Sequence, residues 1–155
     1  MTIRLLAALA FASIFLSAAR PAFAGDKKDF EKTVPLPMGG GVVPLGGKVG
    51  DVVVDSVNVR NAPNKGDFEK AKGEPRVSCR PKFQVSLTNK GKDVTRVLVL
   101  VKILNKDGDK VLLCDTKEKL KPGTKDFKSN LCWLQGMQVN DWPKAKMFVS
   151  VSSLD

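Results

Sequence analysis

Histidine and tyrosine are absent from this 155-residue chain, and only 6% of its residues are aromatic. Without histidine there is no Ser-His-Asp or Cys-His pair for nucleophilic catalysis, no two-histidine zinc motif and no side chain that ordinarily titrates near neutral pH. The three cysteines form no CxxC pair, so they do not resemble a zinc site either. We therefore expect no catalytic residues, no metal and no cofactor, and we expect that the protein is not an enzyme.

Long hydrophobic runs are also missing, because no segment approaches the roughly 20 apolar residues of a membrane-spanning helix. The nearest is Leu5 to Leu16, a mostly apolar run of 12 residues that follows the positive Arg4. It leads to an Ala-Phe-Ala sequence at residues 22–24, which matches the small-x-small rule for signal-peptide cleavage. We predict a bacterial-type signal peptide over residues 1–24 and no transmembrane segment. The mature chain then begins at Gly25 and is secreted or periplasmic.

Residues 25–50 contain seven of the 13 glycines and three of the nine prolines in the chain. This composition disfavours helices and regular sheet ladders, so it predicts a Gly/Pro-rich flexible arm. The arm also holds apolar residues, including Val34, Leu36 and Leu45, and a purely solvated linker would have fewer of them. Either the arm packs over the rest of the chain or it binds something else.

Residues 51–155 carry the two-residue alternation of apolar and polar side chains that is typical of half-buried β-strands. Turns are expected at an Asn-Lys-Asp-Gly sequence at 105–108 and a Lys-Pro-Gly sequence at 121–123. The best helical stretch, 65–72, is short and highly charged. We predict one domain over 51–155, an all-β, immunoglobulin-like antiparallel β-sandwich of about seven strands. Its main strands are expected at 53–59, 82–88, 97–104, 111–114, 127–134 and 147–152.

The alternation also predicts which side chains face the core of the sandwich. Val53, Val57 and Val59 share one face of their strand, although Asp55 interrupts it. The core residues that we expect are Val57, Val59, Phe83, Val85, Leu87, Val97, Val99, Val101, Ile103, Val149 and Val151.

The strand at 97–104 is apolar on both faces. Leu98, Leu100 and Leu104 lie on the face opposite to its predicted core residues. A strand with two apolar faces is ordinarily covered on both sides. We expect the 25–50 arm to cover Leu98 and Leu100, with a second copy of the protein or another partner as the alternatives.

A hairpin follows an apolar strand, then come a Pro-Gly turn, an aromatic residue and a final valine-rich strand. The residues are Ile103-Leu104-Asn105-Lys106-Asp107-Gly108, Leu120-Lys121-Pro122-Gly123, Phe127 and Phe148-Val149-Ser150-Val151. This series of motifs resembles the FxLYD-type family of bacterial immunoglobulin-like domains. The family's signature tyrosine has no counterpart, because the chain contains no tyrosine. The resemblance implies an exported β-sandwich with no known catalytic site.

An oxidising compartment permits disulfides, and three cysteines allow at most one internal bridge. Cys114 and Cys132 flank the turn at 121–123 almost symmetrically, so this pair is favoured. The alternative pair is Cys79–Cys132, because an immunoglobulin-like topology would bring those two strand ends together. In either case one cysteine is left over.

The chain is basic, with 26 Lys and Arg residues against 16 Asp and Glu residues and a formal net charge of +10. Five lysines gather around the Lys-Pro-Gly turn: Lys117, Lys119, Lys121, Lys125 and Lys128. They form either a basic patch for an anionic envelope polymer or an acidic protein, or a solvated strand edge where lysine blocks aggregation. Nucleic acid is not expected as a partner, because the chain has an export signal, no nucleic-acid motif and no aromatic platform.

Two tryptophans, Trp133 and Trp142, bracket a loop that also contains Met137. Trp133 adjoins Cys132, and a tryptophan beside a disulfide is typical of a sandwich core. Trp142 and Met137 are instead candidates for an exposed binding surface. Binding sites on sandwiches lie mostly in end loops, so the stretches 61–74 and 134–143 are the loops that we expect to bind.

These observations favour a non-catalytic interaction module at the cell envelope, which binds an envelope protein or an anionic envelope polymer. Self-association is a further candidate. The alternative function is that of an exported enzyme or redox protein. It would use the left-over cysteine, with Arg80 lowering the pKa of Cys79, or a Ser-Lys pair.

Overall fold

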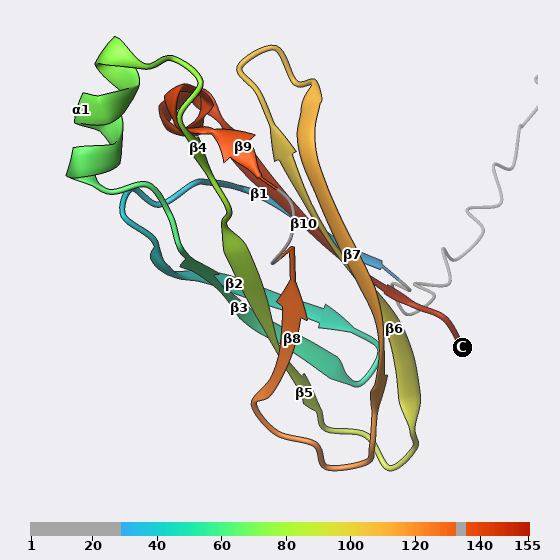
Figure 1. Ribbon diagram of the computed structural model, residues 1–155. Coiled ribbons are helices and arrows are strands. Elements are labelled where there is room, and N and C mark those ends of the chain that lie inside the picture. The colour runs from blue at the N-terminus through green and yellow to red at the C-terminus, as the bar shows by residue number, and fades with distance from the viewer. Residues whose placement is uncertain (1–28, 133–135) are drawn as a thin grey trace, which may run out of the picture.

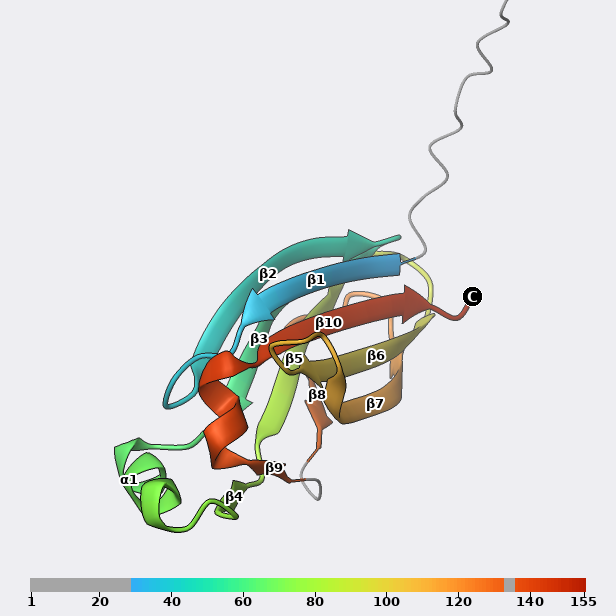
Figure 2. The ribbon, with the colours of Figure 1, turned by 90° about the horizontal axis from the view of Figure 1, so that it is seen from above.

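Figure 1 shows the fold of the chain as a computed structural model, which describes residues 29–132 and 136–155. Within these residues the main architecture is a pair of antiparallel four-stranded sheets that face each other (Figures 1 and 2). The prediction of an antiparallel β-sandwich is therefore confirmed. The predicted signal peptide at 1–24, and Trp133 with its predicted place in the core, lie outside the described residues.

The two sheets draw their strands from the whole length of the described chain. Sheet A has the order β1 (Asp29–Pro35), β10 (Lys146–Ser153), β6 (Thr95–Leu104) and β7 (Lys110–Leu120). Sheet B has the order β2 (Gly41–Val49), β3 (Val52–Arg60), β5 (Lys82–Asn89) and β8 (Phe127–Leu131).

The immunoglobulin strand order is not confirmed. An immunoglobulin constant domain sorts its strands, lettered A to G in chain order, into the sheets ABED and CFG. Here the last strand, β10, lies between β1 and β6 in one sheet. In the other sheet β2, β3 and β5 are neighbours, in the same order as in the chain. The described residues hold ten strands rather than about seven, because β1 and β2 form in the predicted arm and two short strands form at one end.

Short elements cap this end of the sandwich (Figure 2). They are α1 (Lys65–Gly73), the paired strands β4 (Ser78–Cys79) and β9 (Met137–Gln138), and the 3-10 helix η1 (Val139–Lys144). In the described part of the chain, neither helix has the length and apolar content that crossing a membrane requires.

Helix α1 is an exception to the nearly all-β prediction, and its sequence explains why it forms. The side-chain oxygen of Asn64 accepts hydrogen bonds from the backbone N–H groups of Gly66 and Asp67, at 2.8 and 3.2 Å. The Asp67 carboxylate in turn accepts from the Asn64 backbone N–H at 2.8 Å, which completes a capping box. The buried Ala71 anchors the short helix to the cap.

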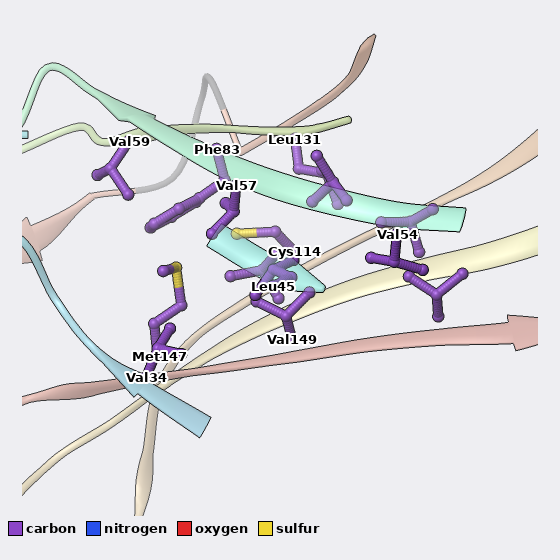
Figure 3. Close-up of a cluster of buried hydrophobic side chains, with 14 of the residues drawn as sticks. Val34, Leu45, Val54, Val57, Val59, Phe83, Cys114, Leu131, Met147 and Val149 are labelled. Atoms are coloured by element: carbon purple, nitrogen blue, oxygen red, sulfur yellow. The ribbon is translucent and has the colours of Figure 1, made fainter. Parts of the chain in front are cut away.

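The core lies between the two sheets, where Figure 3 shows a cluster of its side chains. All eleven predicted core residues are buried, with Val85, Val99 and Val149 fully so. Val53 is the exception among the predicted inward residues, because it is half-exposed. A β-bulge between Val54 and Ser56 shifts the register, so Val52 and Val54 face the core before it, and Val57 and Val59 after it.

The prediction of a flexible arm over 25–50 is wrong for its described part, because residues 29–49 hold strands β1 and β2. Both are edge strands, the position in which proline is tolerated because one side of the strand needs no ladder hydrogen bonds. In β2 the pairing is interrupted between Pro44 and Gly47, and Gly46 adopts a positive φ of 65° in this irregularity. The glycines thus shape an irregular strand rather than a free linker.

Side chains tie the two sheets together along both edges of the sandwich. Between β1 and β2, the Phe30 ring lies against the bare backbone of Gly47, and Lys32 Nζ donates a hydrogen bond to the Leu45 carbonyl at 2.7 Å. Between β7 and β8, a disulfide joins Cys114 to Cys132, with their Cα atoms 5.2 Å apart. The favoured cysteine pair is confirmed, and Cys79 is the free cysteine.

We expect the Cys114→Ala/Cys132→Ala double variant to lose about 3 kcal/mol of unfolding free energy, because the bridge closes a loop across 18 residues. Urea unfolding followed by circular dichroism measures this loss. Cys79→Ala serves as the control and should cost clearly less, since it removes a thiol without opening a loop. An equal stability of the double variant and the native chain would contradict the role of the bridge.

The Phe30–Gly47 contact predicts a second stability effect. A Cβ atom at Gly47 would collide with the Phe30 ring, so Gly47→Ala should cost about 1–3 kcal/mol in the same unfolding assay. Gly73→Ala is the matched control, because a Cβ there meets no atom within 4 Å. Phe30→Ala/Gly47→Ala should be less destabilised than the sum of its single variants, since removing the ring removes the collision. Additive losses would show that the two residues do not interact.

Candidate functional site

A cluster of large apolar side chains lies on the outer face of sheet A, on the side away from the core. Leu98, Leu100 and Leu104 come from β6, Leu113 comes from β7 and Phe148 from β10. All five are half-buried. We call these five residues the leucine face.

Strand register brings the five side chains together. Alternate residues of a strand share one side of a sheet, so Leu98, Leu100, Lys102 and Leu104 form one row along β6. Lys102 lies opposite Leu113 of β7 and opposite Phe148 of β10. Four of the five apolar side chains therefore lie on the two central strands, β6 and β10, and Leu113 lies on the edge strand β7.

Charged side chains lie within and around this apolar centre, and cations outnumber acids among them. The outer face of sheet A carries three acids, Asp29 and Glu31 on β1 and Asp115 on β7. It carries six cations, so the net charge of the face is +3: Arg96, Lys102, Lys110, Lys117, Lys119 and Lys146.

The cations of the leucine face are not neutralised by ion pairs. The one ion pair found among the described residues joins Lys72 to Glu69 on α1, in the cap. Lys102 Nζ lies 5.2 Å from the centre of the Phe148 ring, which is a cation–π distance. At one end of the face, Arg96, Lys117 and Lys119 line a shallow hollow together with Glu118 and Leu154.

Sheet B shows the contrast, because its outer face is mainly polar. There Gln84 donates a side-chain hydrogen bond to Asn130 at 2.9 Å, and Thr88 donates one to Asp55 at 2.9 Å. An antiparallel sheet ordinarily has one face on the core and one polar face toward water. Sheet B follows this pattern and sheet A departs from it.

The predicted arm does not cover Leu98 and Leu100. Strand β1 pairs with β10 inside sheet A, and β2 pairs with β3 inside sheet B, so neither strand lies over the leucine face. The apolar residues of the arm are instead used in the core, where Val34, Leu36 and Leu45 are buried. Among the described elements, none forms a layer over the outer face of sheet A (Figures 1 and 2).

The five predicted lysines are all exposed, but they do not form one patch. Lys117 and Lys119 lie on β7 beside the leucine face. Lys121 and Lys125 lie in the turn between β7 and β8. Lys128 belongs to β8 and donates from Nζ to Ser86 Oγ at 2.8 Å on the outer face of sheet B. These lysines are therefore close in sequence around the turn, but the two sheets separate them in the structure.

The prediction of an exposed binding surface at Trp142 and Met137 is wrong. Trp142 is fully buried and its Nε1–H donates to the Pro37 carbonyl at 3.2 Å, while Met137 is 5% exposed. Both side chains fill the end of the sandwich beneath the cap. The signal in the sequence was ambiguous, because large apolar residues near a loop suit a core as well as a surface.

The two predicted binding loops do come together, as parts of the cap. Asn140 in η1 donates from Nδ2 to the Ala71 carbonyl of α1 at 3.3 Å, and the Val139 backbone N–H donates to the Val77 carbonyl at 2.9 Å. Beside α1, an open hollow of about 400 Å³ is lined by Met38, Gly39, Pro63, Asn64, Lys65 and Phe68. Met38 is 58% exposed at this hollow, and no motif in the sequence marks it.

Two arrangements bear on the alternative of an exported enzyme. Burial is the largest influence on the Cys79 thiol and raises its pKa, whereas a reactive cysteine needs a lowered pKa. Ser86 and Lys128 do form a Ser-Lys contact, but Lys128 is exposed, and lysine acts as a base where it is desolvated. Both arrangements therefore lack the environment that activates the nucleophile.

Comparison of the sequence with known protein families and with curated proteins finds no match. The resemblance to FxLYD-type domains thus stays a prediction from motifs, and the candidate site is judged on its own chemistry.

The raised pKa of Cys79 leads to a prediction of reactivity. A raised pKa keeps the Cys79 thiol protonated to a higher pH. The rate of its alkylation by iodoacetamide should therefore increase with pH, and the midpoint of this increase should lie at a higher pH in the folded chain than in the urea-unfolded chain. The Cys114–Cys132 bridge stays closed without reductant, so Cys79 is the thiol that reports in both states. A lower midpoint in the folded chain would indicate an activated cysteine and would favour the redox alternative.

Proposed function

We propose that the protein is an exported, non-catalytic interaction module of the cell envelope, and that it binds an anionic envelope partner through the leucine face. The observation that carries this proposal is the difference between the two sheets, since only sheet A presents a large apolar cluster outward. Contiguous apolar patches rimmed by polar residues mark interaction sites on soluble domains.

The energetics support a binding role for the leucine face. Each leucine that is moved fully out of water contributes roughly 1.5–3 kcal/mol, and the leucine face holds four leucines that are half-buried at present. A partner that covers them gains part of this free energy. The cations around them add attraction for negative charge and speed encounter with an anionic surface.

Export and the lack of catalysis are parts of the same proposal. The sequence supports export through its predicted signal peptide, and a disulfide between Cys114 and Cys132 is compatible with an oxidising compartment. The proposal does not depend on an immunoglobulin strand order, because it uses the outer face of a sheet rather than the topology. A rigid strand surface is also a suitable platform for recognition.

The test uses isolated bacterial envelopes as the probe and the mature chain from Gly25 onward. After incubation and centrifugation, we expect the native protein in the pellet and the Leu98→Ser/Leu100→Ser variant mostly in the supernatant. Both substitutions lie outside the core, so circular dichroism should show an unchanged fold.

The matched control is Val42→Ser/Val53→Ser on the outer face of sheet B, which removes two valines from the other side of the sandwich. It should pellet like the native protein. Equal pelleting of the leucine variant and the native protein, or no pelleting of either, would overturn the proposed function.

A further inference from the structure

We propose that the partner of the leucine face is the surface of an anionic lipid bilayer, on which the protein docks with sheet A toward the lipid. This inference rests on the proposed function and names the class of partner. It follows from the composition, the charge and the shape of the face, and each of these favours lipid over another protein.

The composition of the face differs from that of a protein interface. Protein interfaces are enriched in tyrosine, tryptophan, phenylalanine, methionine and arginine and depleted in lysine, and leucine is under-represented among their energetic hot spots. The leucine face and its rim contain four leucines, one phenylalanine, five lysines, one arginine and three acids, without tyrosine, tryptophan or methionine. Leucine and phenylalanine combined with lysine and arginine are also the residues of amphipathic helices that lie in a membrane interface.

The charge of the face suits an anionic leaflet and disfavours a second copy of the chain. A net charge of +3 attracts anionic headgroups, and two such faces repel each other when they are pressed together. Five of the six cations lie at the rim, on β7 and at the ends of β6 and β10, whereas Lys102 lies in the middle of the face between Leu113 and Phe148. Their long stems can extend along the face while their ammonium groups reach the phosphates.

The face extends over all four strands of sheet A. The face is roughly 15 Å wide, because its four strands lie about 4.8 Å apart. It is roughly 20 Å long, because Leu98 and Leu104 are six residues apart along β6. The hollow at Arg96, Lys117 and Lys119 lies at one end of this area, and it places three cations around a recess that Glu118 and Leu154 also line. Half-buried leucines reach the boundary between headgroups and acyl chains without crossing the bilayer.

The test is co-sedimentation with vesicles of phosphatidylglycerol and phosphatidylcholine in equal amounts, compared with pure phosphatidylcholine vesicles. We expect the native protein to bind the anionic vesicles at least tenfold more tightly. Lys117→Glu/Lys119→Glu should reduce this affinity at least tenfold, because each basic charge near an anionic leaflet is worth about a fivefold change.

The matched control is Lys48→Glu/Lys82→Glu, which makes the same change of charge on the outer face of sheet B, where both lysines are exposed. It should bind anionic vesicles clearly better than the Lys117/Lys119 variant. Leu98→Ser/Leu100→Ser should also weaken binding, and circular dichroism verifies that each variant is folded.

Several results would overturn the lipid proposal. The first is equal affinity for the two kinds of vesicle, and the second is an equal loss of affinity in the two charge variants. The third is an affinity for soluble polyphosphate that equals the affinity for anionic vesicles and is unchanged in the leucine variant. A dimer in sedimentation that disappears in the leucine variant would show that the occupant is a second copy. Binding to envelopes without binding to vesicles would retain the proposed function and reject lipid as the partner.

Discussion

Strand β6 is apolar on both faces, and a two-layer sandwich can bury only one of them. Its inner residues, including Val99 and Val101, are fully buried between the sheets. Its outer residues, Leu98 and Leu100, remain half-exposed at the centre of sheet A. Because β10 and β7 flank β6 on either side, the unburied face becomes the middle of a surface rather than a protected edge. The core of the protein and its candidate binding surface therefore originate in one strand.

The sandwich includes two edge strands, β1 and β2, that the sequence pattern does not predict. Alternation of side chains predicted the central strands and every expected core residue, because burial on one face imposes a period of two. It did not predict β1 and β2, since glycine and proline are read as breakers in isolation. At a sheet edge the same residues are tolerated, and Gly47 is needed there because Phe30 leaves no room for a side chain. The pairing partner of β1, which is β10, lies more than 110 residues away in the chain.

Two identical tetrapeptides show that a short local sequence does not determine its own secondary structure. Asp-Phe-Glu-Lys occurs at 29–32 in strand β1 and at 67–70 in helix α1. The second copy follows Asn64, which caps the helix, whereas the first pairs along its length with β10. The fate of Trp142 has a similar cause, because its burial depends on the Pro37 carbonyl, supplied from a distant part of the chain. Likewise, the lysines near the 121–123 turn diverge because β7 and β8 belong to opposite sheets.

The charge on sheet A is also unevenly distributed across its width. The acids Asp29 and Glu31 lie on β1 at one edge, whereas Lys117 and Lys119 lie on β7 at the other. On an anionic surface the β7 edge is attracted and the β1 edge is repelled, so the sheet settles with β7 nearer to the surface. The orientation on the anionic partner that we propose would thus follow from the order of strands within the sheet, because this order determines which charges lie at which edge.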